Sequence, residues 1–175
     1  MTRRPTRILV AAAFLCVSAF MSAENAIAQQ MQQISYSASP ENSTYLQQLN
    51  IDAGDTPKHI VRVFELHRVP TPVPLINGLR LVEDWIRGLT DVTDGNGSST
   101  VYGVFALENG DRFFARLAQV NQNAAGKISA TAVGPITGGT GTLAEIHGVV
   151  RLSANFDVKS GFNKGQTDIE FSIGK

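Results

Sequence analysis

The stretch Gly134–Leu152, GPITGGTGTLAEIHGVVRL, joins a cluster of glycines to the start of a long alternating segment. Four glycines, at positions 134, 138, 139 and 141, fall within eight residues. Beyond them, apolar residues recur at every second position: Ile146, Gly148, Val150, Leu152, Ala154 and Phe156. A period of two held this long predicts a half-buried β-strand. The glycines predict a sharp turn into that strand, because glycine adopts backbone angles that a Cβ forbids.

Other alternating segments predict further strands, namely His59–His67, Leu79–Val92, Lys127–Val133 and Gln166–Ile173. Asn109-Gly110 lies between two more, Thr100–Glu108 and Asp111–Val120, and predicts a hairpin with a two-residue turn, since both turn positions need a positive φ. Such a turn would place three residues of the first strand, Tyr102, Val104 and Ala106, opposite three of the second, Leu117, Ala115 and Phe113.

These segments predict an all-β fold, since the mature chain shows no amphipathic helix of ordinary length and no internal repeat. Seven or eight short antiparallel strands in one small domain are typical of a barrel or a sandwich. A barrel is favoured because closure removes exposed sheet edges. We therefore predict that residues 56–175 form a closed antiparallel β-barrel of about eight strands, whose interior is just wide enough for side chains or one small ligand.

Residues 1–28 have the composition of a secretory signal peptide. Arginines at positions 3, 4 and 7 precede the apolar run Ile8–Met21, and Ala26-Ile27-Ala28 matches an A-x-A cleavage site. The apolar run is shorter than the ~20 residues of a membrane span. We expect export to the periplasm or the extracellular space, with no stable membrane insertion after cleavage. The one cysteine, Cys16, would leave with this segment, so no disulfide is expected.

The remaining composition narrows the function classes. Residues 29–55 begin with a Gln-, Ser- and Asn-rich stretch without a period and are expected to form a mobile tail. The formal net charge is zero and no basic stripe is present, so no nucleic-acid partner is expected. The three histidines, His59, His67 and His147, lack the spacing of metal ligands, so no metal site is expected.

Three segments together resemble the allene oxide cyclase and dirigent superfamily of β-barrels. Val63–His67, VFELH, resembles the first strand of the plant cyclases, and Tyr102–Gly110, YGVFALENG, resembles their hairpin. Ile136–Gly141, ITGGTG, followed by Gly148, resembles the glycine turn that cyclases and dirigent proteins share. The resemblance implies an eight-stranded barrel with an apolar cavity, often a trimer, that acts without a cofactor.

The resemblance also implies functional residues. Glu65 stands where the cyclases have a glutamate that assists epoxide opening, and Thr71-Pro72 stands near the place of a Ser-Pro segment. His67 replaces an asparagine, which departs from the cyclase pattern. Glu65 and His67 share a strand face with two valines, which suggests that they point into an apolar lumen, where burial would disfavour the charged form of each and either could act as a general acid or base. The alternative is that both lie at the barrel mouth, solvated or paired with Arg62 or Arg87.

Three functions are consistent with these observations. The first is a cofactor-free cyclase or isomerase acting on a small, largely apolar substrate, with Glu65 and His67 catalytic. Thr71, Pro72, Trp85 and Tyr102 would then contact the substrate. The second is a dirigent-like or carrier protein that binds an apolar small molecule without chemistry. The third is a structural barrel filled by its own side chains. A homo-oligomer is also expected, because both faces of the predicted hairpin are partly apolar.

Overall fold

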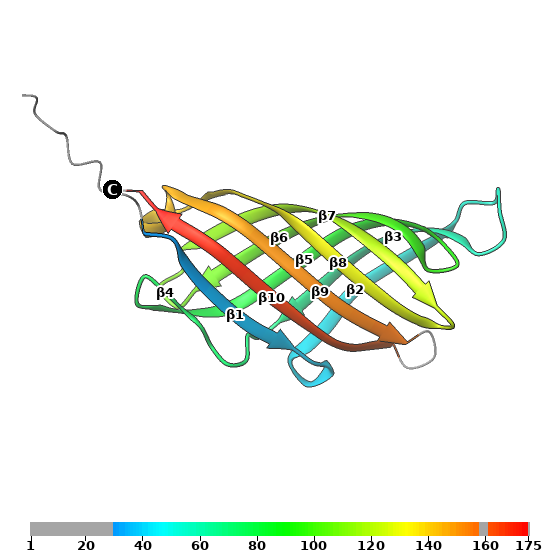
Figure 1. Ribbon diagram of the computed structural model, residues 1–175, viewed down its shortest axis with the longest axis horizontal. Helices are drawn as coiled ribbons and strands as arrows, with labels where there is room; N and C mark the ends of the chain where they lie inside the picture. Colours follow the sequence, from blue (N-terminus) through cyan, green and yellow to red (C-terminus); the bar gives the residue numbers. More distant parts are fainter. Residues whose placement is uncertain (1–29, 158–160, 175) are drawn as a thin grey trace, which may run out of the picture.

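The computed structural model describes residues 30–157 and 161–174 (Figure 1). The predicted signal peptide, residues 1–28, lies outside this range. Within it the chain forms ten β-strands and two short 3-10 helices, η1 and η2. In chain order the elements are β1 (Gln32–Ala38), η1 (Pro40–Asn42), β2 (Ser43–Asp52), β3 (His59–Arg68), β4 (Leu75–Ile76), β5 (Leu79–Thr93), β6 (Asn96–Leu107), β7 (Arg112–Ala124), β8 (Lys127–Gly139), η2 (Gly141–Leu143), β9 (Ile146–Asp157) and β10 (Gly161–Ile173).

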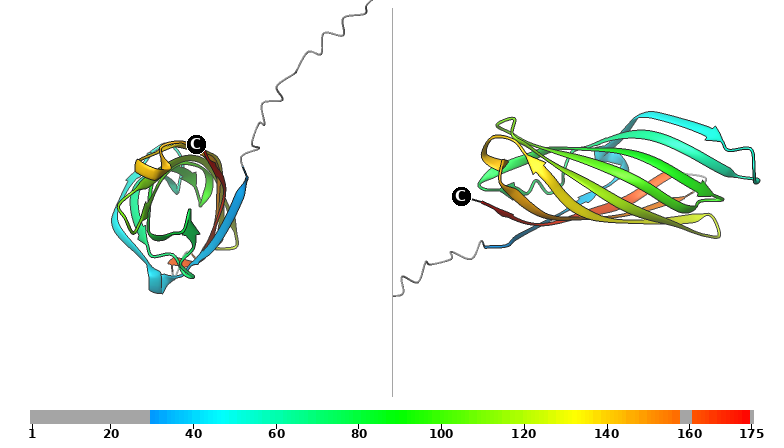
Figure 2. Two further views of the ribbon diagram at one scale, coloured as in Figure 1. Left: turned by 90° about the vertical axis from the view of Figure 1, so that its left-hand side faces the viewer. Right: turned by 90° about the horizontal axis from the view of Figure 1, so that it is seen from above.

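The strands form one antiparallel sheet in the order β1-β10-β9-β8-β7-β6-β5-β3-β2, with β4 paired only to β5. Viewed along its length the sheet curls into a ring (Figure 2). The edge strands β1 and β2 are not neighbours in the sheet, so backbone pairing does not close the ring. The prediction of a closed barrel of about eight strands is corrected to a curled, ten-stranded sheet. The reason is that the chain starts beside its last strand and then crosses through η1 to the other edge.

Residues 29–55, expected to form a mobile tail, contain β1 and β2 instead. Tyr36 and Ala38 of β1 are buried, whereas β2 is exposed along almost its whole length. Strand β2 pairs through its backbone with β3, and Leu49 lies opposite Val63. An edge strand with little buried surface needs no apolar residue at every second position, so its sequence shows no period.

The β6–β7 hairpin has a longer turn than the two-residue turn that was predicted. Leu107 N–H donates to the Asp111 carbonyl at 2.8 Å, and Gly110 N–H donates to the Leu107 carbonyl at 2.9 Å. Gly110 has a φ of 89°, which fits a three-residue connection ending in a left-handed glycine. The extra residue shifts the register by one. Phe105 therefore lies opposite Phe113, and the predicted pairing of Ala106 with Phe113 is wrong.

The alternation that begins at Ile146 is confirmed, because Ile146, Val150 and Leu152 are buried along β9. The glycine cluster has a different role from the predicted one. Three of its four members lie inside β8, and only Gly141 belongs to the turn, where its φ is 54°. At Gly134 a Cβ would overlap the carbonyl oxygen of Arg116 in β7, so this glycine permits close contact between two strands.

One half of the barrel interior is filled by packed side chains. Phe105 and Phe113 stack with ring centroids 4.5 Å apart and an interplanar angle of 10°. Fully buried aliphatic and aromatic side chains surround them, including Ile76, Leu81, Leu143 and Phe171. The packed half lies toward the β6–β7 and β8–β9 turns.

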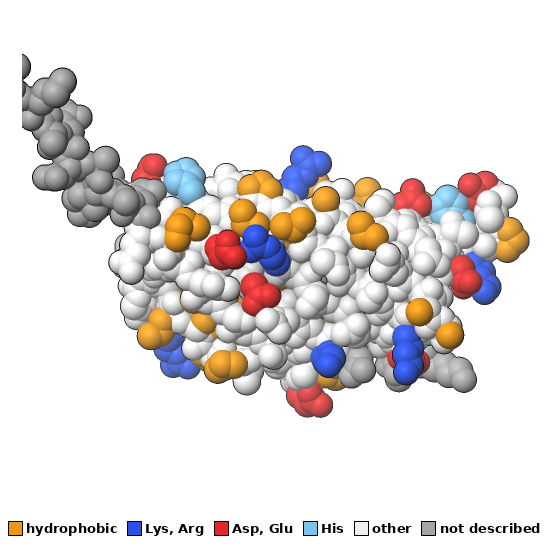
Figure 3. All heavy atoms as spheres, in the orientation of Figure 1, with side chains coloured by type: hydrophobic (Ala, Val, Ile, Leu, Met, Phe, Trp, Pro, Cys, Tyr) orange, Lys and Arg blue, Asp and Glu red, His pale blue; other side chains and the backbone are white. Residues whose placement is uncertain are grey.

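The face seen in Figure 3 mixes apolar side chains with charges of both signs.

Candidate functional site: the hollow half of the barrel

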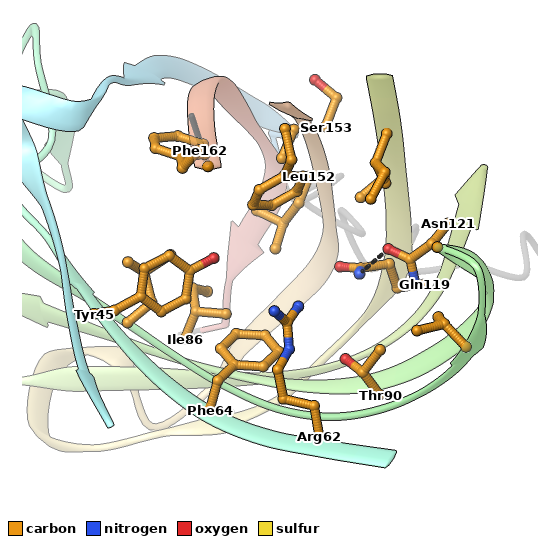
Figure 4. Close-up of a pocket in the computed structure, with 18 of the residues that line it drawn as sticks. Tyr45, Arg62, Phe64, Ile86, Thr90, Gln119, Asn121, Leu152, Ser153 and Phe162 are labelled. Atoms are coloured by element: carbon orange, nitrogen blue, oxygen red, sulfur yellow. Dashed lines mark hydrogen bonds between the residues drawn. The ribbon is translucent and has the colours of Figure 1, made fainter. Parts of the chain in front are cut away.

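The other half of the barrel encloses a cavity of about 430 Å³, within the size range of small-molecule sites. It lies toward the end of the barrel that carries Gly95, Ile128 and Gly161, which are among its lining residues; Figure 4 shows it in close-up. Its wall is mainly apolar, and its large apolar residues include Ile60, Phe64, Leu66, Ile86, Ile128, Leu152, Phe156 and Phe162. The interior is thus not filled throughout by its own side chains.

Arg62 of β3 is the unusual residue of this wall. It faces inward because it shares the lumen side of the strand with Phe64 and Leu66. Its guanidinium carbon lies 5.4 Å from the centroid of the Phe64 ring, a cation–π arrangement. Its Nε is buried without a hydrogen-bond partner. Among the described residues, no carboxylate lies within 4.0 Å of its guanidinium nitrogens.

Tyr45 of β2 lines the cavity beside Arg62. Its ring meets Phe64 edge to face, with centroids 6.0 Å apart. Burial raises the pKa of Tyr45, and the nearby positive charges of Arg62 and Arg68 offset part of that rise. The phenol therefore stays protonated at neutral pH and can donate a hydrogen bond. Figure 4 shows its hydroxyl directed into the cavity.

A second polar group lies at the wall formed by β5 and β7, where Thr90, Gln119 and Asn121 line the cavity and Ser99 of β6 bonds to two of them. Ser99 is its centre: its hydroxyl donates to Thr90 Oγ1 at 3.0 Å and accepts from Asn121 Nδ2 at 3.0 Å. Gln119 Nε2 donates to Asn121 Oδ1 at 2.8 Å (Figure 4). These groups satisfy one another, so they can meet a neutral polar group of a ligand without requiring a charge.

A buried ionic cluster lies next to the cavity, at the boundary with the packed half. Arg68 Nη2 donates to Asp84 Oδ2 at 2.5 Å and to Thr167 Oγ1 at 3.3 Å. The Tyr36 hydroxyl donates to the same Asp84 oxygen at 2.7 Å. Burial raises the pKa of Asp84, while Arg68 and Tyr36 favour its ionised form. Burial and the adjacent carboxylate raise the pKa of Tyr36 well above its ordinary value.

This cluster joins four strands across the interior: β1, β3, β5 and β10. It includes residues from both sides of the gap between the sheet edges. Near it, the Ser37 N–H of β1 donates to the Thr71 carbonyl at 3.1 Å. Side-chain hydrogen bonds and this backbone bridge thus connect parts of the sheet that strand pairing leaves apart.

The residues predicted as catalytic lie on the outer face of the barrel. Glu65 Oε2 accepts from Arg87 Nε at 2.6 Å, and the His67 ring lies 4.3 Å from the Trp85 ring. Neither Glu65 nor His67 lines the cavity. The expectation that they point into the lumen is wrong. The face of β3 that carries Ile60, Phe64 and Leu66 has more apolar volume than the face with the valines, and the larger apolar face is the buried one.

The residues predicted to contact a substrate also lie outside the cavity wall. Trp85 is half-buried on the outer face and donates through Nε1 to Glu83 at 2.9 Å. Tyr102 is 47% exposed, with the Arg116 guanidinium 5.8 Å from its ring centroid. Thr71 and Pro72 are exposed in the loop after β3. The structure therefore brings Glu65, His67, Trp85 and Tyr102 onto one outer region, and leaves Thr71 and Pro72 apart in the loop.

The sequence reasoning missed Arg62, Arg68, Tyr45 and Asp84. The sequence could have indicated Arg62 and Arg68, because they fall on the same face of β3 as its larger apolar residues. Tyr45 lies in the segment taken for a tail, and no periodicity marks it. Asp84 is separated from Tyr36 by 48 positions, so only the folded sheet reveals their contact.

Two general features of the described residues bear on the class of protein. No group of three or more His, Cys, Asp or Glu side chains in this part of the chain is arranged to hold a metal ion. Across residues 30–157 and 161–174, no helix has the length and apolar character needed to cross a bilayer.

Comparison with known proteins defines the fold class. Solved structures of two pterocarpan synthase dirigent proteins, PsPTS1 and GePTS1, superpose on this chain with a TM-score of 0.54 and 12% sequence identity each. The superposition with PsPTS1 covers 83% of this chain and 97% of PsPTS1. The superposition with GePTS1 covers 84% of this chain and 92% of GePTS1. The chain thus has a dirigent-like β-barrel fold. No family model and no curated protein sequence matches it.

Proposed function

We propose that the barrel binds a small, largely apolar molecule in its hollow half, as a dirigent-like or carrier protein without acid–base chemistry of its own. The cavity of about 430 Å³ with its apolar wall carries this proposal. The dirigent-like fold supports it, because one of its solved examples is described as a pterocarpan synthase dirigent protein. At 12% identity that likeness extends to the fold and not to the ligand.

The location of Glu65 favours binding over the cyclase or isomerase hypothesis. A carboxylate on the outer face, paired with Arg87, cannot touch a molecule held inside the barrel. His67 is on the same outer face, against Trp85. Because neither residue lines the cavity, this pair is not placed to carry out acid–base catalysis on a molecule bound there.

The test measures binding of the fluorescent apolar dye N-phenyl-1-naphthylamine to the intact protein. Ala130 lines the cavity, and the next residue, Thr131, is exposed on the outer face of the same strand. Ala130→Phe should weaken dye binding at least tenfold by filling the cavity, whereas Thr131→Phe, the matched control, should leave it unchanged. Absence of dye binding to the wild type, or wild-type binding by a folded Ala130→Phe variant, would contradict the proposal.

We also propose that the protein is a homo-oligomer. An outer row of apolar side chains crosses three adjacent strands in register, formed by Leu49, Val63 and Leu89. These residues are 63%, 52% and 50% exposed. Contiguous exposed apolar surface is typical of contact sites. Sedimentation equilibrium should show an assembly, expected to be a trimer, that Leu89→Lys dissociates; a monomeric wild type would contradict this part.

Export to the periplasm or the extracellular space is a further part of the proposal. It rests on the composition of residues 1–28 alone. Expression of the full chain in a bacterial host, followed by mass spectrometry of the periplasmic fraction, should show a chain beginning at Gln29. Retention of the whole chain in the cytoplasm would contradict it.

A further inference from the structure

We infer that the ligand of the hollow half is an amphipathic organic anion whose carboxylate pairs with Arg62. This inference rests on the proposed binding function and adds the chemical class of the ligand. Two arginines, Arg62 and Arg68, line the cavity. Arg68 is already paired with Asp84 at 2.5 Å, which leaves Arg62 as the cation of the wall without a carboxylate partner among the described residues.

The environment of Arg62 makes an anion a favourable occupant. A buried donor without an acceptor costs free energy, and Arg62 Nε is such a donor. The Phe64 ring beneath the guanidinium and the apolar wall reduce the access of water that would otherwise hydrate the charge. A guanidinium presents parallel N–H donors that match the two oxygens of a carboxylate.

Tyr45 supplies a second donor next to Arg62. Its hydroxyl is directed into the cavity, and the edge-to-face contact with Phe64 fixes the ring (Figure 4). The one acidic residue of the wall, Asp157, lies at the end of β9 and not within 4.0 Å of Arg62. The anion-binding groups are therefore concentrated on β2 and β3.

The rest of the wall is suited to an apolar part of the ligand. Ile86, Leu152 and Phe162 lie around the cavity in Figure 4 and carry no polar side-chain atoms. On the β7 side, Gln119 and Asn121 are bonded to each other at 2.8 Å and impose no charge on a ligand. A molecule with one carboxylate at the β2–β3 side and an uncharged, mainly apolar remainder is therefore complementary to the whole wall.

The experiment compares two dyes with the same aromatic skeleton. 1-Anilinonaphthalene-8-sulfonate carries an anionic group that N-phenyl-1-naphthylamine lacks. Arg62→Met keeps most of the length of the side chain and removes the charge. It should weaken binding of the anionic dye by about tenfold to a hundredfold, the range expected for a charge-assisted hydrogen bond, and change binding of the neutral dye less than threefold.

Control variants and competitors separate the possible explanations. Arg62→Lys should retain most of the affinity for the anionic dye, and Arg116→Met, on the outer face, should change neither dye. Decanoate should displace the anionic dye from the wild type at least tenfold better than from Arg62→Met, whereas 1-decanol should displace the neutral dye equally from both. Near-UV circular dichroism verifies folding, because partly folded chains also bind the anionic dye.

The outcomes distinguish this inference from the proposed function. If Arg62→Met binds both dyes as the wild type does, or loses both equally, the anionic ligand class is refuted. The proposed function then still stands, provided that Ala130→Phe blocks the neutral dye. If the wild type binds neither dye, the proposed function itself fails.

Discussion

Replacing Asp84 with asparagine keeps the size of the side chain and an oxygen that can accept from Tyr36, but it removes the charge that balances Arg68. Both partners are almost completely buried, with side-chain exposures of 6% for Arg68 and 0% for Asp84. The variant therefore leaves a guanidinium in the barrel interior without a counter-charge. The cluster also links strands on both sides of the gap between β1 and β2, which strand pairing does not bridge.

The expected magnitude follows from this burial. Removal of one partner of a buried ion pair costs about 3–5 kcal/mol, because the remaining charge stays desolvated. At roughly 3 °C per kcal/mol for a domain near 150 residues, the melting temperature should fall by about 10–15 °C. Removing both charges, with Asp84→Leu and Arg68→Met together, should recover a large part of this loss, since no unpaired charge remains.

Urea unfolding followed by far-UV circular dichroism measures the free energy of unfolding of each variant. Glu65→Gln is the matched control, because Glu65 and Arg87 form an ion pair of similar length, 2.6 Å, on the outer face. Solvent screening there limits the expected loss to less than about 1 kcal/mol. If Asp84→Asn costs no more than Glu65→Gln, or if the double variant is no more stable than Asp84→Asn, the reasoning about the buried cluster is refuted.

Three further predictions concern other parts of the fold. Hydrogen bonds to Asp91 and Asp55 raise the pKa of His59 above 6.5, so its ion pairs stabilise the fold below that pH and lose their effect as pH rises through the folded pKa. His59→Gln should therefore lower the free energy of unfolding in urea at pH 5.5 but not at pH 9. The Thr142 hydroxyl and N–H lower the pKa of Asp111 below 3.8, so its stabilising effect is present above that pH and is lost on acidification. The melting temperature of Asp111→Asn should accordingly be below that of the wild type at pH 7, and the difference should shrink as the pH falls below 3.8; a difference independent of pH would contradict this. Gly134→Ala should destabilise the protein in urea by about 1–3 kcal/mol, because its Cβ would overlap a carbonyl of β7.

The sequence predicted the fold class well where one face of a strand is buried. The alternation along β9 and β10 placed Val150, Leu152, Ile169 and Phe171 on one face, and all four are buried. The strand from His59 and the strand containing Trp85 were also predicted. The resemblance to the dirigent superfamily is confirmed at the level of the fold. Strand positions and buried faces can be predicted locally, because a period of two within one segment already shows that one face of the strand is apolar.

The same period cannot by itself decide which face of a strand points inward. In β3 it separated Glu65 and His67 from Arg62 and Arg68 correctly, but the inner and outer sides were assigned in reverse. The orientation depends on how the sheet curls, and the sheet curls so that the face of β3 with the larger apolar volume lies on the inside, where Phe64 and Leu66 line the cavity. Comparing the volumes of the two faces would have given the correct side.

By itself, then, the sequence determined an all-β chain and the buried faces of strands such as β9 and β10, and it predicted a fold like that of dirigent proteins. Only the tertiary structure decided that Arg62 and Tyr45 face a cavity and that Tyr36, Arg68 and Asp84 meet in the interior. The physical reason is that alternation is a property of neighbouring residues. A charge in an apolar interior depends on partners from distant strands, and strand order is set by the packing of the whole sheet.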